Sequence, residues 1–211
     1  MMAEAWRVRD SPAHDTLCTS FIFASVPRPS MNAPVERYTA TAIALHWVMF
    51  ILIACGFALA VYMTGLKFSP LKLKLVAWHK WIGVTVFLLA VVRLAWRMTH
   101  PPPPLPAAMP VWQRRAAAVS HLALYALILV IPLTGWLMSS AFGVATLYLG
   151  LVLLPNPIAA DKALAELLRS VHVFLNYTLL TLVVLHVLAA IKHHVVDRDN
   201  VLARMLFTGK G

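Results

Sequence analysis

Five of the chain's nine histidines lie inside long apolar stretches, an unusual setting for a side chain that titrates near neutral pH. Ionisable groups in such stretches are costly to bury and usually have a function. Imidazole is also a common axial ligand of haem iron and a frequent ligand of zinc. The first candidates for chemistry are therefore His46, His79, His121, His172 and His186.

Two of these histidines, His172 and His186, lie in one apolar run, VHVFLNYTLLTLVVLHVLAAIKHH. At ~100° per residue, the fourteen steps between them turn a helix by about 1400°, which is about 40° short of four full turns. The two imidazoles then share one helix face, with their backbones ~21 Å apart along the axis. One helix would thus present one imidazole near each surface of a membrane.

The positions of the five histidines within their apolar stretches sort them into two layers. His79 and His172 come near the predicted outer ends, whereas His46, His121 and His186 come near the inner ends. A single histidine in lipid can be satisfied by a backbone carbonyl, but matching depths on several helices favour metal ligation.

Two kinds of metal chemistry could account for this pattern. Two imidazoles from two helices at one depth give a six-coordinate haem iron with no open position, which suits electron transfer, and two layers indicate two haems. The alternative is a metal-ion carrier. Zinc sites prefer three or four ligands, often including a carboxylate, and no Asp or Glu lies in the core of these stretches. We therefore expect haem.

The elements that must position the histidines are membrane-spanning helices. The chain has 211 residues and is 61% hydrophobic, whereas a soluble domain is nearer half apolar. A helix needs roughly 20 apolar residues to cross the hydrocarbon core. We expect an all-α integral membrane four-helix bundle binding two haems b within residues 36–206, with spans at about 41–64, 75–97, 116–139 and 168–191.

Three further segments fall outside these spans. Residues 1–35 are expected to form a disordered arm, and Met31 could be the native start. Residues 141–156 are apolar but interrupted by glycine and proline, which predicts a re-entrant or interfacial segment rather than a fifth span. Residues 207–211 are a short tail.

The distribution of basic residues predicts the orientation. Four spans place both termini on one side of the membrane, and the positive-inside rule makes the more basic side cytoplasmic. These flanking charges also explain the net charge of +10 without nucleic-acid binding. The termini and the linker on their side carry 12 of the 18 lysines and arginines: Arg7, Arg9, Arg28, Arg37, Arg93, Arg97, Arg114, Arg115, Lys192, Arg198, Arg204 and Lys210.

Several motifs together resemble the bacterial cytochrome b561 family. They are RYTATAIALHW, HKWIGVTVFLLAVVRLAWR followed by a proline-rich linker, HLALYALILVIPLTGW, and two histidines fourteen apart before HHVVDRDNVLARM. The resemblance covers about residues 37–206 and implies a four-helix, di-haem b protein of the bacterial inner membrane that exchanges electrons with quinone. Some members of this family are superoxide oxidases, which pass an electron from superoxide to ubiquinone.

The resemblance also implies the haem ligands. By depth, His46 pairs with His186 at an inner haem and His79 pairs with His172 at an outer haem. His121 lies at the inner depth and could compete with His46, although four ligands already complete two haems.

Further residues are candidates for contacts to a haem propionate or a quinone: Arg93, His121 and His193. Each has an ordinary structural alternative, namely a snorkelling arginine, a carbonyl-bonded histidine or a solvated one. His193 follows His186 by seven residues and would share its face to within ~20° in an α-helix. The outer lysines Lys67, Lys72, Lys74 and Lys80 could steer superoxide, or could be solvated at the interface.

Two functions remain open at this point. The first is a quinone-linked oxidoreductase, with superoxide as a candidate donor and ubiquinone as the partner. The second is a haem b membrane-anchor subunit that relays electrons from a hydrogenase or dehydrogenase, docked to the loop between residues 141 and 169.

Overall fold

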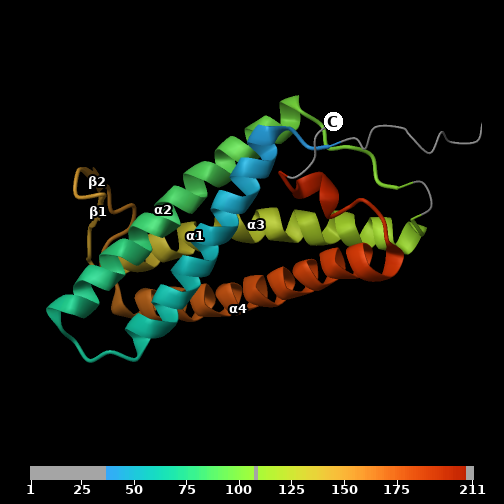
Figure 1. Ribbon diagram of the computed structural model, residues 1–211. Coiled ribbons are helices and arrows are strands. Elements are labelled where there is room, and N and C mark those ends of the chain that lie inside the picture. Colours follow the sequence, from blue (N-terminus) through green and yellow to red (C-terminus); the bar gives the residue numbers. More distant parts are fainter. Residues whose placement is uncertain (1–36, 107–108, 208–211) are drawn as a thin grey trace, which may run out of the picture. The chain divides into compact units, whose positions relative to one another are not determined.

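Four long helices make up most of the chain in the computed structural model, which describes residues 37–106 and 109–207 (Figure 1). They are α1 (Ala40–Thr64), α2 (Pro70–Thr99), α3 (Val111–Ala141) and α4 (Lys162–Lys192). Each predicted span lies inside one of them, and all four are long and apolar enough to cross a membrane. The predictions for the N-terminal arm and for the end of the tail fall outside the described residues.

The helix starts are set by local chemistry. Thr39, Ser69 and Asp161 are N-caps, whose side-chain oxygens accept hydrogen bonds from backbone N–H groups of the first turns of α1, α2 and α4. Pro70 follows its cap at the first position of α2, where its missing N–H costs nothing. The caps of α2 and α4 lie ahead of the apolar stretches, so these two helices begin before the predicted starts at residues 75 and 168.

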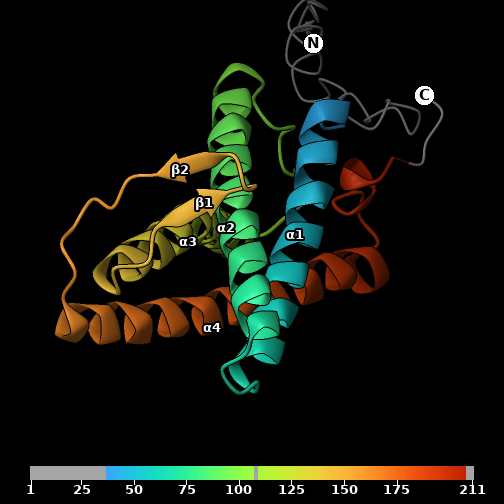
Figure 2. The same cartoon turned by 90° about the vertical axis from the view of Figure 1, so that its left-hand side faces the viewer.

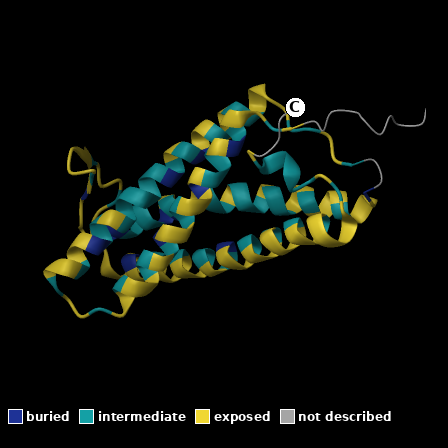
Figure 3. Ribbon diagram, viewed as in Figure 1, coloured by how far each residue is buried: buried dark blue, intermediate teal, exposed yellow. Residues whose placement is uncertain are grey.

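The helices pack as two neighbouring pairs, α1 with α2 and α3 with α4, and α2 also packs against α3. Figure 2 shows α1 and α2 side by side, with α3 and α4 crossing behind them. A small cluster of Met49, Val86 and Ala90 forms the tightly packed centre where α1, α2 and α3 meet. Large apolar side chains are exposed along every helix (Figure 3), as expected for faces that contact lipid rather than water.

Residues 141–156, which we predicted to be re-entrant or interfacial, contain a β-hairpin. Strands β1 (Thr146–Tyr148) and β2 (Val152–Leu154) pair antiparallel, with Tyr148 opposite Val152. The turn between them has positive φ at Leu149 (53°) and Gly150 (74°), a conformation that suits glycine. The described part of the fold is therefore four long helices with one short hairpin outside them. Strands of three residues are too short to be predicted from the sequence pattern.

The hairpin is held on the bundle by side chains of α2 and α3. Trp81 Nε1 donates to the Leu147 carbonyl at 2.7 Å, and the Thr85 and Tyr148 hydroxyls are 2.9 Å apart. Trp136 Nε1 donates to the Pro155 carbonyl at 3.0 Å. These contacts place the hairpin beside the half of the bundle that contains His79.

The C-terminal segment folds back onto the opposite half. After α4 the chain makes one π-helical turn, His193–Asp197, passes Arg198 in the left-handed region (φ 51°), and ends in a 3-10 turn, Ala203–Met205. Trp47 Nε1 on α1 donates to the Met205 carbonyl at 2.8 Å. The tail thereby reaches the residue next to His46.

Candidate haem sites

The outer pair, His79 and His172, faces across the bundle from α2 and α4. Their ring centroids are 6.4 Å apart and the rings are nearly perpendicular, at 86°. With metal–nitrogen bonds of about 2.0–2.1 Å and roughly 1.1 Å from ring nitrogen to ring centre, two imidazoles on opposite sides of one metal ion have centroids about 6.3 Å apart. The outer pair therefore has the separation that one iron between two imidazoles requires.

Both outer histidines use Nδ1 for protein contacts. His79 Nδ1 lies 3.0 Å from the Gly56 carbonyl of α1. His172 Nδ1 lies 2.9 Å from the Thr134 hydroxyl and 3.1 Å from the Ile131 carbonyl, both on α3. A metal-bound histidine typically donates its other ring N–H to such an acceptor, which fixes the ring and the tautomer. These contacts leave Nε2 of each ring for a metal.

A cavity of about 540 Å³ opens beside the outer pair and is lined by both histidines. This is within the range of about 300–1,000 Å³ for cofactor pockets. Gly83, one turn after His79, lines it, and a Cβ built there would meet no atom within 4 Å. Glycine inside a helix costs about 1 kcal/mol of stability relative to alanine, so its presence at position 83 needs another reason. The open space over Gly83 would let a flat group lie against the helix backbone.

A second glycine, Gly135 on α3, lets the His172 ring approach its helix. A Cβ there would lie 3.1 Å from Cε1 of His172. The outer site is thus built from all four helices, with α1 and α3 supplying the acceptors and the close backbone, and α2 and α4 supplying the imidazoles.

The inner pair, His46 on α1 and His186 on α4, has nearly the same separation. Its ring centroids are 6.3 Å apart at an interplanar angle of 56°. His121 on α3 lies closer to His186, with centroids 5.4 Å apart, which is less than one metal between them requires. His121 also hydrogen-bonds to the Ala117 carbonyl of its own helix. The geometry favours His46 over His121 as the partner of His186.

Two arginines of α2 lie on one side of the inner site. Arg93 Nε donates to the Tyr125 hydroxyl at 3.0 Å. The guanidinium carbons of Arg93 and Arg97 lie 5.8 Å and 5.7 Å from the centre of the Tyr125 ring. The charge of Arg93 acts on all three inner histidines, so it lies where an anion of an inner cofactor would need a counter-charge.

His193 lies beyond the α-helical part of this element. It is the C-cap of α4, where its N–H still bonds to the Ala189 carbonyl, and it begins the π-helical turn. Its Nδ1 is 2.7 Å from a carboxylate oxygen of Asp199 and 3.1 Å from one of Asp197. Those contacts orient His193 and leave Nε2 as the nitrogen for any ligand.

The outer lysines divide into two groups. Lys72 and Lys80 line the outer cavity, together with Arg169 of α4. Lys80 Nζ donates to the Ser139 hydroxyl at 2.6 Å, and Lys72 Nζ donates to the Leu66 carbonyl at 2.7 Å. Lys74 instead lies over the Trp78 ring. No sequence pattern had pointed to Thr134, Gly56, Gly83 or Gly135 as parts of the site, since their roles depend on contacts between helices.

Four membrane-length helices with paired histidines between them are the features of a helical membrane cytochrome. Residues 37–208 match the family described as prokaryotic cytochrome b561, and the chain belongs to this family. It is therefore a multi-pass membrane protein of electron transfer, in a family that binds haem b.

Three curated relatives align along nearly their whole length. Cytochrome b561 homolog 2 of Escherichia coli K12 is 37% identical over 177 residues, covering 83% of this chain and 93% of the relative. Cytochrome b561 homolog 1 of the same organism is 30% identical, covering 82% of this chain and 98% of the relative. A Yersinia pestis protein named "Probable superoxide oxidase CybB" is 28% identical, covering 83% of this chain and 99% of the relative.

Proposed function

We propose that the chain binds two haems b and moves electrons between the two sides of the bacterial inner membrane, with ubiquinone as donor or acceptor. The observation that carries this proposal is the pair of ring separations, 6.3 Å for His46 with His186 and 6.4 Å for His79 with His172. Both match one iron between two imidazoles, and α4 contributes one histidine to each pair.

The residues of this chain have four tasks in that function. His46, His79, His172 and His186 hold the two irons, and the haem supplies the one-electron chemistry. The Gly56 carbonyl holds the His79 ring from behind, and Thr134 with the Ile131 carbonyl holds His172. Arg93 supplies positive charge at the inner site. The apolar helix faces would keep water away from both sites, and two imidazoles for each iron would leave no position open to oxygen.

Superoxide is the donor that the outer surface favours. Lys72, Lys80 and Arg169 line the outer cavity, and a small anion would be drawn towards such a basic mouth. The Yersinia pestis relative is itself named as a superoxide oxidase. In this proposal both termini are cytoplasmic, the outer site faces the periplasm, and ubiquinone reacts near the inner site beside His193.

The alternative is a haem b anchor subunit that relays electrons from a hydrogenase or dehydrogenase to quinone. The hairpin favours this alternative, because it exposes apolar side chains that a partner protein could cover: Leu151 is 83% and Leu153 66% exposed. Exposed apolar side chains of this kind also suit lipid, so the hairpin by itself does not make a docking site.

Purification of the chain in detergent tests the proposal. The expected result is an optical spectrum of two low-spin b haems per chain, with ubiquinone reduction when superoxide is generated. A colourless protein overturns the proposal. Two haems without superoxide-driven turnover, together with activity in a larger complex, would select the anchor subunit instead.

A further inference from the structure

The C-terminal segment includes an arginine, Arg204, whose Nε has no hydrogen-bond partner among the described residues. Arg204 lies in the 3-10 turn Ala203–Met205, and this turn is tied to α1 through Trp47. Arg204 Nη1 donates to the Pro104 carbonyl of the α2–α3 linker at 2.5 Å. Its Nε is buried and makes no hydrogen bond within the described part of the chain. Buried charged donors are rarely left unpaired, so this one indicates an acceptor that the described part of the chain does not supply.

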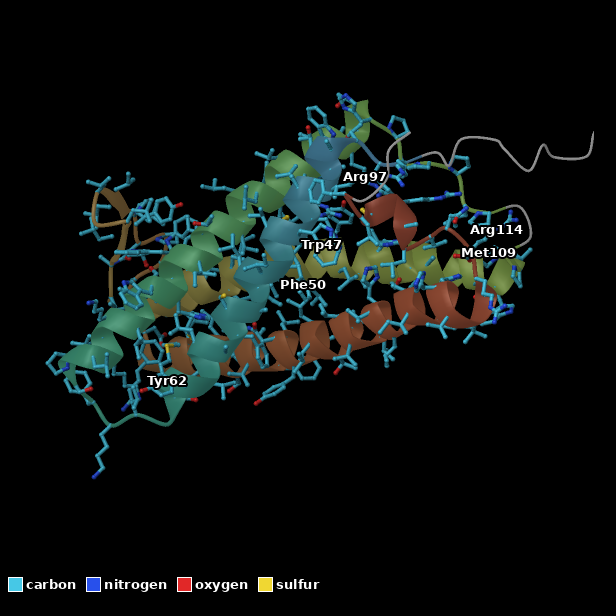
Figure 4. All side chains as sticks on the ribbon, in the orientation of Figure 1. Trp47, Phe50, Tyr62, Arg97, Met109 and Arg114 are labelled. Carbon is cyan, nitrogen blue, oxygen red and sulfur yellow. The ribbon has the colours of Figure 1, made fainter. Side chains whose placement is uncertain are left out.

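Two more guanidinium groups converge on the same place. The charges of Arg93, Arg97 and Arg204 all act on Tyr38, which directly precedes the N-cap of α1. Arg93 and Arg97 also flank Tyr125. Figure 4 shows Arg97 and Trp47 at this end of the bundle, by the C-terminal segment.

The described acidic groups nearest in sequence to Arg204 already have partners. Asp197 accepts from Lys192 at 2.6 Å, and Asp199 accepts from His193 at 2.7 Å. Tyr38 does not supply the missing anion, because burial raises the pKa of its phenol above the usual 10.0 and keeps it protonated. Three converging cations therefore call for an anion with more than one oxygen.

The place of this arginine cluster identifies the anion. Arg93 acts electrostatically on His46, His121 and His186 as well as on Tyr38, so it connects the arginine cluster to the inner histidine pair. We infer that Arg204, with Arg93 and Arg97, binds the propionate carboxylates of the inner haem, so that the C-terminal segment closes over this haem. The inference rests on the proposed function. Guanidinium and carboxylate match as planar two-point partners, so an arginine at this position suits a propionate better than a lysine would.

The experiment uses the full-length His79→Ala chain, which keeps only the inner haem and so gives one redox midpoint. In this background Arg204→Ala should lower the midpoint potential and speed haem transfer to excess apomyoglobin by about tenfold or more, the usual cost of losing a contact that supports a metal site. Arg204→Lys should fall between. Arg198→Asn is the matched control, since it removes an exposed charge from the same segment and asparagine tolerates the left-handed backbone there.

Four outcomes decide the inference. An unchanged midpoint and unchanged haem transfer in Arg204→Ala overturn it, as does an equal effect of Arg198→Asn. A phosphate of an inner-leaflet lipid has similar chemistry, so each measurement is repeated in nanodiscs of phosphatidylcholine with and without phosphatidylglycerol. An effect of Arg204 that needs phosphatidylglycerol also overturns it. If the His79→Ala chain holds no haem at all, the proposed function fails rather than the role of Arg204.

Discussion

At the scale of single residues, the proposed haem sites depend on four histidines with well-defined neighbours. The two outer imidazoles are each oriented by a contact from another helix, and of the five histidines in the spans only these two lie in the outer layer. The inner site differs, because His121 lies 5.4 Å from His186 and is the third imidazole of that layer. The two layers should therefore respond differently to histidine substitutions.

Replacing His79 or His172 with alanine should remove about one of two haems per chain, because one imidazole is too few to retain a six-coordinate haem. Haem content of the purified variant, measured as the pyridine haemochrome, checks this. His46→Ala and His186→Ala should likewise lose the inner haem. His121→Ala should keep both haems, and loss of one there would show that His121, not His46, is the ligand.

Gly83→Leu should exclude the outer haem while the protein still folds. Its side chain would enter the open space of the outer cavity, and leucine favours the helix over glycine. Haem content should fall by about one per chain while thermal unfolding in detergent stays the same or rises. Gly65→Ala, in the α1–α2 loop, is the control and should keep both haems. The new Cβ there meets its nearest atom at 3.7 Å.

At the scale of elements, α4 couples the two sites. It supplies His172 to one pair and His186 to the other, and its rigid helix sets both the depth and the facing of these residues. None of the other three helices supplies a histidine to both pairs. The distance and angle between the sites therefore depend on the uninterrupted helical geometry of α4 between its two histidines.

Inserting one alanine between Leu179 and Leu180 tests this coupling. It turns one half of α4 by ~100° relative to the other, so only one histidine can keep its partner. The variant should retain about one haem per chain. An alanine inserted after Gly65, in the loop outside the helices, is the matched control. Retention of both haems in the α4 variant would contradict the shared-helix arrangement.

At the scale of the whole molecule, the two ends of the bundle differ in their charges. The outer end has lysines around the cavity beside His79 and His172, whereas the inner end has the arginines beside His46 and His186. An anionic donor that approaches from outside and an anionic cofactor group at the inside would each meet cations. The predicted orientation, with both termini in the cytoplasm, assigns these ends to the two aqueous compartments.

Changing three outer lysines together to glutamate should slow superoxide-driven haem reduction by roughly tenfold or more at low salt, because the electrostatic field at the outer end then repels superoxide. The three are Lys67, Lys72 and Lys74. The dependence on ionic strength should flatten or reverse. Stopped-flow absorbance of the haem measures both. Arg115→Glu on the other side should leave the rate unchanged. If the triple variant reacts like the parent chain, the lysines are only solvated.

Much of the fold could be read from the sequence because a membrane leaves few choices. Apolar runs of this length must be helices, since backbone groups in lipid have to be paired internally, and each predicted span lies within an observed helix. The hairpin was missed because its strands are three residues long. The π-helical turn after Lys192 was missed because it departs from regular α-helical spacing.

The sequence by itself determined which residues could bind haem and at which depth, because depth follows from position along a helix and facing follows from its period. Only the tertiary structure decided how the helices meet. It showed that His46 rather than His121 has the right separation from His186, and that Gly83 leaves an open space in the outer cavity. It also placed the charges of Arg204, Arg93 and Arg97 where all three act on Tyr38. Such contacts join residues far apart in the chain, and local periodicity carries no information about them.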